Sequence, residues 1–416
     1  MEFTSIDQIM TYLNSQRFSY NKEYTLKNVI LLFNHLKINE STTPIIHVTG
    51  TNGKGSTCAM LESIYRNNGL KTGLFSSPYF ISNFEQIKVN FEDISESDYV
   101  CLFNDVFKVA REIENHDQKY QFSVFEYDVA IAMLYFMQQQ TDINIIEVGL
   151  GGRLDATNAL MHTNVSVFTT ISLDHQAILG DTRQKIVEEK VGIIKENSTV
   201  VVGNGIKNDI LEIIENHAHA KNSKLISVPE IKTILDNSFP DYQQYNASTA
   251  YYTAQILNTQ LSPRFQISDE QIIAGIKMTF WSGRWQIIDN FFGKKLIIDG
   301  AHNEEGVKAI VSLICNLKNQ PIIILGSNTK YRAKCLCKTL APLAKRLVLT
   351  SSKNSMSLLK DDLFTCIPTQ DSEKFSYEEL DKVFEILEKS TDDILITGSL
   401  YLIGDVFQKY PHLMKK

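Results

Sequence analysis

The chain has 416 residues, of which 43% are hydrophobic and 21% are charged, and its formal net charge is −7. The length suggests two domains or three, and the composition is typical of a globular protein. An acidic chain offers no general basic field to nucleic acid, and no stretch reaches the ~20 apolar residues of a membrane span. The six cysteines form no Cys-x-x-Cys pair, and residues 1–10 hold no signal-peptide-like apolar run. We expect a cytoplasmic protein with no nucleic-acid or membrane partner.

The first predicted strand, 44–48, runs into a glycine-rich turn at residues 50–56 with the sequence GTNGKGS. A turn of this kind before a helix is suited to holding phosphate, because glycines let backbone N–H groups approach the oxygens and the helix end is partly positive. Lys54 can reach the β- and γ-phosphates, and Ser56 is placed near phosphate and metal. The strict Walker pattern is not met, since Val48 replaces its first glycine and Gly55 follows the lysine. We infer a nucleotide-binding loop.

The first half of the chain alternates strand and helix patterns, which indicates a parallel sheet with crossover helices. Further strands are predicted at 71–76, 143–148, 165–171 and 199–202 from their β-branched residues. Apolar periodicity and cap residues predict helices at about 56–69, 95–115, 125–137, 181–190, 247–257 and 268–277.

Polar side chains stand where two of these strands end. Glu147 closes the strand 143–148, and His175 follows the strand 165–171. Ligands of open α/β sheets collect outside the carboxyl ends of the strands, so we expect both side chains to face the crevice that holds Lys54. Glu147 is the candidate magnesium ligand, because Mg²⁺ bound to nucleotide phosphates needs only one or two protein carboxylates. A solvated glutamate and a structural histidine are the alternatives, and histidine is an uncommon magnesium ligand.

The segment 281–286 interrupts the alternation and holds both tryptophans of the chain. After it, strands are predicted at 296–298, 322–325, 347–350 and 394–397, with helices between them. We therefore predict an α/β protein in which a P-loop-containing parallel-sheet ATPase domain precedes a smaller Rossmann-like α/β domain. The expected bounds are 1–280 for the ATP-binding domain, 281–286 for a junction and 287–416 for the second domain.

The second half repeats the pattern of a strand followed by polar residues, in the run DGAHN at 299–303. Glycine and alanine there permit close backbone approach, and Asp299 and His302 can present polar groups to a ligand. Capping of the following helix is the alternative explanation for this run.

Taken together and in order, the motifs resemble those of folylpolyglutamate synthases and dihydrofolate synthases of the Mur ligase superfamily. The resemblance spans about residues 45–405 and is carried by six segments: 50–56, 76–78 (SSP), 147–158 (EVGLGGRLDATN), 173–182 (LDHQAILGDT), 299–303 and 396–401 (ITGSLY). The glycine after the loop lysine favours the folate branch, because the cell-wall ligases usually carry two threonines there.

The resemblance implies an ATP-dependent acid–amino-acid ligase of folate biosynthesis and one-carbon metabolism, which adds L-glutamate to the carboxylate of a reduced folate. ATP would phosphorylate that carboxylate, and the glutamate amine would displace phosphate from the acyl phosphate. Lys54, the helix N-terminus and Mg²⁺ would offset the repulsion between the anions. Dihydropteroate, converted to dihydrofolate, is a second substrate that the same site could accept.

By matching position, the resemblance also implies roles for particular residues. ATP would be bound by Gly53, Lys54, Gly55, Ser56, Asn246, Arg284 and Asp299. Magnesium would be held by Ser77, Glu147, His175 and Lys190, the last as a carbamate, and the catalytic residues would be Lys54, Glu147, His175 and Lys190. The pterin-bearing substrate would contact Phe125, Glu126, Leu154, Asp155 and Ala156, while His302 and Ser399 would receive glutamate. A carbamate requires a locally neutral amine, and an unmodified salt-bridged lysine is the alternative at this position.

Five positions depart from the family pattern, two of them in the run 329–331, which keeps Lys330. Tyr79 and Gln86 stand where histidine and arginine are frequent, the run TKY at 329–331 replaces Asp-Lys-Asp, and Gln286 replaces a frequent glutamate. These departures concern substrate preference and efficiency rather than the phosphate or metal positions.

Three other functions remain open on the sequence. The main activity could be dihydrofolate synthesis, the chain could be a ligase of the cell-wall branch, or it could be a nucleotide-binding regulator whose ligase chemistry has decayed. The altered 329–331 run allows the last of these. We expect a monomer, because no extended apolar stripe is visible.

Overall fold

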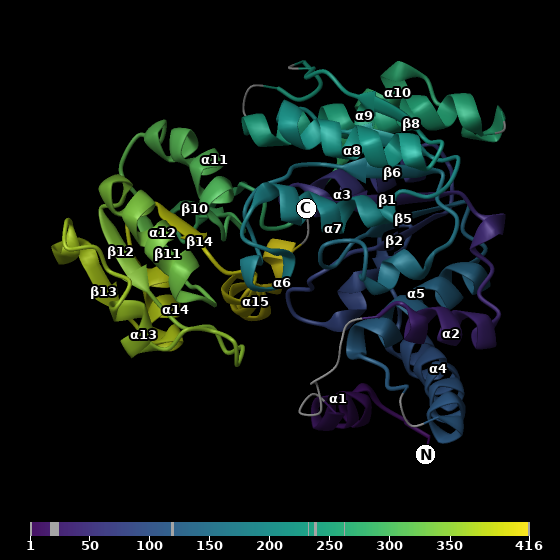
Figure 1. Ribbon diagram of the computed structural model, residues 1–416. Coiled ribbons are helices and arrows are strands. Elements are labelled where there is room, and N and C mark those ends of the chain that lie inside the picture. Colours follow the sequence, from purple (N-terminus) through teal and green to yellow (C-terminus); the bar gives the residue numbers. More distant parts are fainter. Residues whose placement is uncertain are drawn as a thin grey trace. The chain divides into compact units, whose positions relative to one another are not determined.

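The computed structural model describes residues 2–16, 25–117, 120–231, 233–236, 239–261 and 263–414. The chain divides into two compact units, the first made of Met1–Leu235 and Gln244–Thr279, the second of Asp236–Gln243 and Phe280–Lys416. Each unit is built on a sheet of its own (Figure 1).

The first unit contains an eight-stranded sheet in the order β4-β3-β2-β5-β1-β6-β7-β8. Its strands are β1 (Ile45–Thr49), β2 (Thr72–Phe75), β3 (Ile87–Val89), β4 (Glu92–Asp93), β5 (Ile143–Glu147), β6 (Val165–Phe168), β7 (Thr199–Val202) and β8 (Lys224–Ser227). The neighbouring strands β2, β5, β1, β6, β7 and β8 pair in parallel, in that order across the sheet. The strand β3 pairs antiparallel with both β2 and β4. The strands β1, β5, β6 and β7 are buried throughout, which explains their nearly continuous apolar sequences.

Helices follow most of these strands. They are α1 (Ile6–Gln16), α2 (Lys27–Leu36), α3 (Lys54–Asn67), α4 (Glu96–His116), α5 (Val124–Gln139), α6 (Gln176–Leu179), α7 (Arg183–Lys190), α8 (Asn208–Ala220), α9 (Asp241–Gln260) and α10 (Asp269–Met278). The helices α2, α4 and α5 pack on one another, and α3 packs on β1, β2, β5 and α10. Two short 3₁₀ turns, η4 (Ala156–Ala159) and η5 (Val191–Ile193), lie near the candidate site.

The second unit contains a six-stranded sheet in the order β13-β12-β11-β14-β10-β9, parallel except for the β9–β10 hairpin. Its strands are β9 (Gln286–Phe291), β10 (Lys294–Ile298), β11 (Ile322–Leu325), β12 (Arg346–Leu349), β13 (Phe375–Tyr377) and β14 (Ile394–Thr397). Its helices are α11 (Glu304–Cys315), α12 (Lys330–Leu340), α13 (Lys360–Phe364), α14 (Leu380–Lys389) and α15 (Leu400–Lys409).

The predicted α/β class is confirmed, and each predicted strand is present. Several further elements were not predicted, namely α1, α2, β3, β4, α8, β8, β9 and β13. The edge strands β8 and β13 are only partly buried, so their sequences lack the apolar run that marks a central strand. The predicted strand 165–171 ends at Phe168, because the next residues turn to bond the phosphate loop.

Ser95 caps α4, since its hydroxyl accepts a hydrogen bond from the backbone N–H of Asp98. The same hydroxyl donates to the Asp98 side chain at 2.8 Å. The 351–375 stretch contains the short helix α13.

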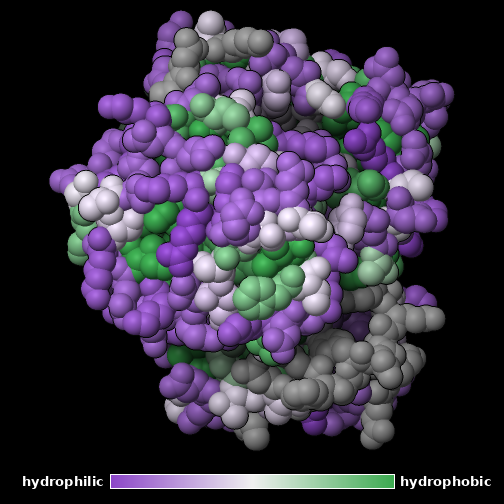
Figure 2. All heavy atoms as spheres, turned by 90° about the vertical axis from the view of Figure 1, so that its left-hand side faces the viewer, coloured by the Kyte–Doolittle hydropathy of each residue, from purple (hydrophilic) through white to green (hydrophobic). Residues whose placement is uncertain are grey.

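Among the helices of the described residues, none combines the length and the apolar character that crossing a bilayer requires. On the face in Figure 2, hydrophobic side chains form separate groups between hydrophilic residues.

The helix pair α3 and α10 meets at a glycine. A Cβ placed on Gly275 would lie 2.6 Å from the backbone Cα of Ile64. The Ser63 hydroxyl donates to the Gly275 carbonyl oxygen at 2.6 Å. The helices therefore touch backbone to backbone, which fixes α3 behind the loop at its N-terminus.

We expect Gly275→Ala to lower the free energy of unfolding by about 1–3 kcal/mol, because the added methyl group overpacks a contact made by backbone atoms. Urea unfolding measures this change. Lys277→Ala, an exposed change on the same helix, should stay within about 0.5 kcal/mol of the wild type. An equal effect of the two substitutions would contradict the packing argument.

Candidate functional site

The turn after β1 forms the centre of the candidate site. It leads into α3, which begins at Lys54, and Gly53 has a φ of +86°. A Cβ on Gly53 would lie 2.3 Å from Asn246 Oδ1, and a Cβ on Gly50 would lie 1.9 Å from Thr169 Oγ1. Only glycine fits at either position. The first N–H groups of α3 have no acceptor within the helix and can bind an anion.

The loop after β6 clamps this turn. The N–H of Thr51 donates to the Thr170 carbonyl oxygen at 2.7 Å. The Thr51 hydroxyl donates to the carbonyl of Ser172 at 3.1 Å and accepts from its N–H at 3.0 Å. The hydroxyl of Thr169 donates to the Asn52 carbonyl at 2.6 Å. The phosphate loop is thus held in one shape before any ligand binds.

Two lysines converge on one carbonyl oxygen of the loop. Lys54 Nζ donates to the Gly50 oxygen at 3.2 Å, and Lys190 Nζ donates to the same oxygen at 2.9 Å. Burial, and after it the charge of Lys54, lower the pKa of Lys190 to about 7, although the carboxylates of Asp174 and Asp155 oppose the shift. In the described part of the chain, the hydrogen-bond partner of Lys190 is a carbonyl rather than a carboxylate, unlike that of a salt-bridged lysine.

Glu147 and Ser77 lie at the ends of neighbouring strands. Glu147 ends β5 and is buried, and its Oε2 accepts a hydrogen bond of 3.4 Å from the backbone N–H of Ser77, beyond β2. Burial raises the pKa of the Cys58 thiol, the charge of Glu147 adds to the rise and that of Lys54 opposes it. Glu147 and Lys54 therefore act on the same buried thiol in α3.

His175 lies on the loop that clamps the phosphate turn. It is exposed, precedes α6 and has a φ of +48°. Its N–H donates to Asp174 Oδ1 at 2.8 Å. Three residues earlier, Ser172 bonds Thr51. The sequence therefore correctly predicts that the loops carrying Lys54 and His175 meet.

The loop after β5 is organised around Asp155. The buried carboxylate accepts hydrogen bonds from Leu150 N–H at 2.7 Å, Thr157 N–H at 3.0 Å and the Thr157 hydroxyl at 2.5 Å. Burial raises the pKa of Asp155, and these hydrogen bonds oppose the rise. Leu154 and Ala156 flank it, and Ala156 is buried. Much of the hydrogen-bonding capacity of Asp155 is thus used inside the loop.

Glu126 and Phe125 also have structural partners. Glu126 completes a capping box at the start of α5, where its Oε2 accepts from Ser123 N–H at 2.7 Å. The ring of Phe125 lies 5.8 Å from that of Phe75, and its Cζ would be 2.5 Å from a Cβ on Gly149. Phe125 therefore packs against the first residue of the loop that carries Asp155.

In the second unit, Asp299 is the centre of a buried cluster. Its Oδ2 accepts from the Tyr242 hydroxyl at 2.8 Å and from Trp285 N–H at 2.7 Å, and its Oδ1 accepts from Ala301 N–H at 2.8 Å. Burial raises the pKa of Asp299, and the charge of Arg284 opposes the rise. A Cβ on Gly300 would lie 2.0 Å from Arg284 Nη1, so this glycine makes room for the guanidinium.

The loops after β10 and β14 meet beside this cluster. The Gly398 N–H donates to the Ala301 carbonyl at 3.0 Å. His302 Nδ1 lies 2.8 Å from the Gly300 oxygen, and Ser399 caps α15. Asn303, the last residue of the 299–303 run, caps α11. The alternative explanation of this run, that it caps the following helix, is therefore correct for Asn303.

Sequence reasoning missed several residues that hold these groups in place: Thr51, Thr169, Thr157, His47 and Tyr242. Hydroxyl residues in loops carry a weak signal, because their partners lie far away in sequence. Tyr242 could have been noticed, since it precedes Asn246 by one turn on α9.

Hydrogen-bond or ion-pair partners can be named for two residues that depart from the family pattern, Gln86 and Gln286, and for Lys330, which keeps the family residue. Gln86 Nε2 and the Tyr99 hydroxyl donate to the buried Asp128 carboxylate at 3.2 and 2.7 Å. Lys330 pairs with Asp362 at 2.7 Å. Gln286 Nε2 donates to the Leu413 carbonyl at 2.6 Å.

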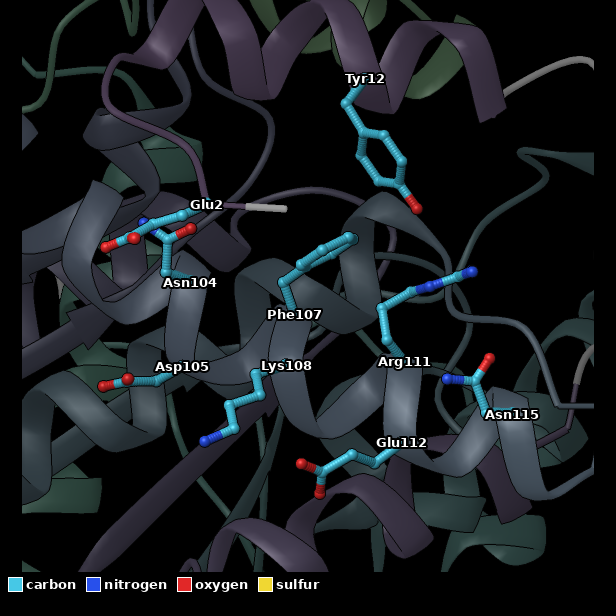
Figure 3. A pocket seen from close by; sticks show the side chains of 9 residues that line it. All are labelled: Glu2, Tyr12, Asn104, Asp105, Phe107, Lys108, Arg111, Glu112 and Asn115. Atoms are coloured by element: carbon cyan, nitrogen blue, oxygen red, sulfur yellow. The ribbon is translucent and has the colours of Figure 1, made fainter.

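A separate cavity of about 890 Å³ lies between α1 and α4 (Figure 3). It is lined by Glu2, Tyr12, Asn104, Asp105, Phe107, Lys108, Arg111, Glu112 and Asn115. None of these is a predicted site residue.

Comparison with known proteins supplies the family. The model of the Mur ligase middle domain matches residues 48–269. The dihydrofolate synthase/folylpolyglutamate synthase of Bacillus subtilis is 31% identical over 388 residues, which cover 86% of this chain and 89% of that protein. The folylpolyglutamate synthase of Lacticaseibacillus casei is 30% identical over 394 residues, 87% of this chain and 89% of that protein. The structure of Mycobacterium tuberculosis folylpolyglutamate synthase complexed with ADP and AMPPCP has the same fold, with a TM-score of 0.85, 22% identity and 97% of each chain covered.

The buried amine of Lys190 should make stability depend on pH. Its pKa in the folded chain, about 7, lies below the ordinary value of 10.5, so between these values the unfolded chain holds a proton that the folded chain has released. The free-energy cost of burying Lys190 is therefore present in full below about pH 7, and it decreases as the pH rises above 7. Between pH 7 and 9, the free energy of unfolding of the wild type should rise relative to Lys190→Met by on the order of 2 kcal/mol.

Urea unfolding in degassed buffer without bicarbonate or metal measures this difference with an unmodified amine. Lys185→Met removes an exposed lysine paired with Asp181 and serves as the control. A wild-type to Lys190→Met difference that stays constant across this pH range would contradict the expected burial of a neutral amine.

Proposed function

Because the chain belongs to the folylpolyglutamate synthase and dihydrofolate synthase family of the Mur ligases, we propose that this ATP-dependent ligase adds L-glutamate to a reduced folate through an acyl phosphate. The observation that carries the proposal is the convergence of Lys54 and Lys190 on Gly50 in the phosphate loop. The Lys54 ammonium beside free helix N–H groups, with Lys190 available for modification next to it, suits a step in which phosphate and carboxylate must approach each other.

The proposed phosphate-binding residues of the ATP site are Gly53, Lys54, Gly55 and Ser56, at the start of α3. The resemblance to the family adds Asn246, Arg284 and Asp299 as further proposed ATP-binding residues. We assign residues 1–280 to the ATP-binding Mur-ligase-like domain, 281–286 to a junction, and 287–416 to a Rossmann-like domain that binds glutamate through His302 and Ser399.

Magnesium fits the proposed donors of the first unit. Within the described residues, no three His, Cys, Asp or Glu side chains gather to hold a metal ion. That finding agrees with a metal held mainly by phosphate oxygens and water, which needs few carboxylates. Ser77 and Glu147, which are hydrogen-bonded neighbours, with His175 and Lys190 supply the protein's share. Bound there, Mg²⁺ would neutralise charge on the phosphates.

The proposed carbamate on Lys190 turns a cation into an anion. A neutral amine adds to carbon dioxide and releases one proton, and the resulting carboxylate can face a metal. The lowered pKa and the burial of Lys190 support the first of these requirements. The change would also remove the repulsion between Lys190 and Lys54.

The proposed pterin-bearing substrate contacts Phe125, Glu126, Leu154, Asp155 and Ala156. Dihydropteroate is the second candidate substrate, since the B. subtilis relative carries both activities in its name. We propose that the protein acts as a monomer. Mass spectrometry of products from dihydropteroate and tetrahydrofolate, offered in parallel, separates the two activities.

We expect Lys54→Ala to reduce the rate of ADP formation by about 10²-fold or more, because the substitution removes a cation that would stabilise the phosphoryl group during its transfer. The assay contains ATP, Mg²⁺, L-glutamate and either substrate, with the added glutamate detected by mass. Lys185→Ala, at an exposed ion pair, should keep wild-type turnover. The proposed function fails if the wild-type protein lengthens neither substrate.

We expect protein incubated with ¹³C-bicarbonate to show an additional carbonyl ¹³C resonance that is absent from Lys190→Met. Lys195→Arg alters another partly buried lysine, which bonds Asn158, and should keep the resonance. A spectrum that is the same in the wild type and in Lys190→Met would rule out the carbamate.

A further inference from the structure

A buried chain of three side chains lies behind the loop that follows β5. His47 Nε2 is 2.8 Å from Thr157 Oγ1, and Thr157 Oγ1 is 2.5 Å from Asp155 Oδ1. His47 and Thr157 are fully buried, and Asp155 is 7% exposed. His47 Nδ1 has no hydrogen-bond partner. Neither His47 nor Thr157 is among the proposed catalytic, ATP-binding, metal-binding or substrate-binding residues.

The direction of the hydrogen bonds follows from the number of protons. Asp155 accepts backbone N–H bonds on both oxygens, from Leu150 and from Thr157, and such bonds stabilise its charged form. The single hydroxyl proton of Thr157 is then donated to Asp155. The Thr157 oxygen must accept from His47, so His47 carries its proton on Nε2 and leaves Nδ1 bare.

The imidazole is held neutral by its surroundings. Burial, and after it the charge of Lys195, lower the pKa of His47 to about 3. Lys195 itself bonds the carbonyl and the side chain of Asn158, at the far end of the same loop. A protonated His47 would place a buried cation near the partly buried Lys195.

One face of β1 holds both ends of the loop. His47 and Thr49 are two residues apart, so their side chains point to the same side of the strand. His47 reaches Thr157, while the Thr49 hydroxyl donates to the Gly151 carbonyl at 2.9 Å. The same strand leads directly into the phosphate loop. The strand that ends at the phosphate loop therefore also sets the position of the loop after β5.

We infer that His47, as the neutral Nε2–H tautomer, and Thr157 are positioning residues that orient Asp155 and the 149–158 loop toward the pteroate or folate substrate. The part of this inference that concerns substrate rests on the proposed function. Neither side chain touches substrate, and their effect passes through the loop. Their loss should weaken the folate side of the reaction more than the ATP side.

Kinetics test the positioning role. Thr157→Val, which keeps the shape and removes the hydroxyl, should raise the KM for dihydropteroate or tetrahydrofolate about tenfold, as expected for loss of one buried hydrogen bond, with the KM for ATP nearly unchanged. Thr157→Ser keeps the hydroxyl and should restore most of the affinity. His47→Leu should behave as Thr157→Val does.

Thr253→Val is the matched control, since it makes the same substitution at a buried hydroxyl that bonds the Thr249 carbonyl within α9. Equal rises in the KM for ATP and folate, or no difference between Thr157→Val and Thr157→Ser, would overturn the positioning role.

The tautomer is tested without any turnover. In ¹⁵N-histidine-labelled protein, the ring signals that disappear in His47→Gln belong to His47. They should show a proton on Nε2 throughout pH 5 to 8 and should shift in Thr157→Val. A proton on Nδ1, or titration in this range, would overturn the inference. If the wild type turns over neither substrate, the proposed function fails while this measurement still decides the state of His47.

Discussion

The carbonyl oxygen of Gly50 is the acceptor on which the candidate site depends. It accepts from Lys54 and Lys190, which lie far apart in the sequence of the first unit. Two ammonium groups at one oxygen repel each other, and little water reaches the buried one to screen the repulsion. The surrounding fold must hold them together, and Lys190 relieves part of the cost by losing its proton near neutral pH.

The sheet order explains how distant residues reach this oxygen. β1 lies between β5 and β6, so the loops after these three strands leave the same edge side by side. The loop after β6 bonds the phosphate turn through hydroxyl and backbone groups, and the loop after β5 is fixed to β1 by His47 and Thr49. The site is therefore supported by short polar contacts between loops. The strands β1, β5 and β6 that carry these loops are buried along their whole length.

The sequence predicts the strands and the meeting of the Lys54 and His175 loops, because parallel strands bring their carboxyl ends to one edge. It does not predict which carboxylates face inward. Asp155 and Glu126 are expected from the resemblance to contact the pterin-bearing substrate, and nothing in the sequence shows that each carboxylate also accepts a hydrogen bond from a backbone N–H a few residues away. The helix predicted at 247–257 begins earlier, at Asp241. Its first turn includes Tyr242, whose partner Asp299 lies far away in the chain. Such partners depend on tertiary packing rather than on local pattern.

The glycines of the phosphate loop are matched to the side chains opposite them. Gly50 faces Thr169 and Gly53 faces Asn246, in each case closer than a methyl group would allow. A side chain at either glycine would collide with the opposing residue and would also strain the backbone, because φ is +153° at Gly50 and +86° at Gly53. A smaller opposing residue would therefore not by itself permit a substitution at either glycine. Grafting this loop into another ATP-binding protein would require transferring the two opposing residues with it.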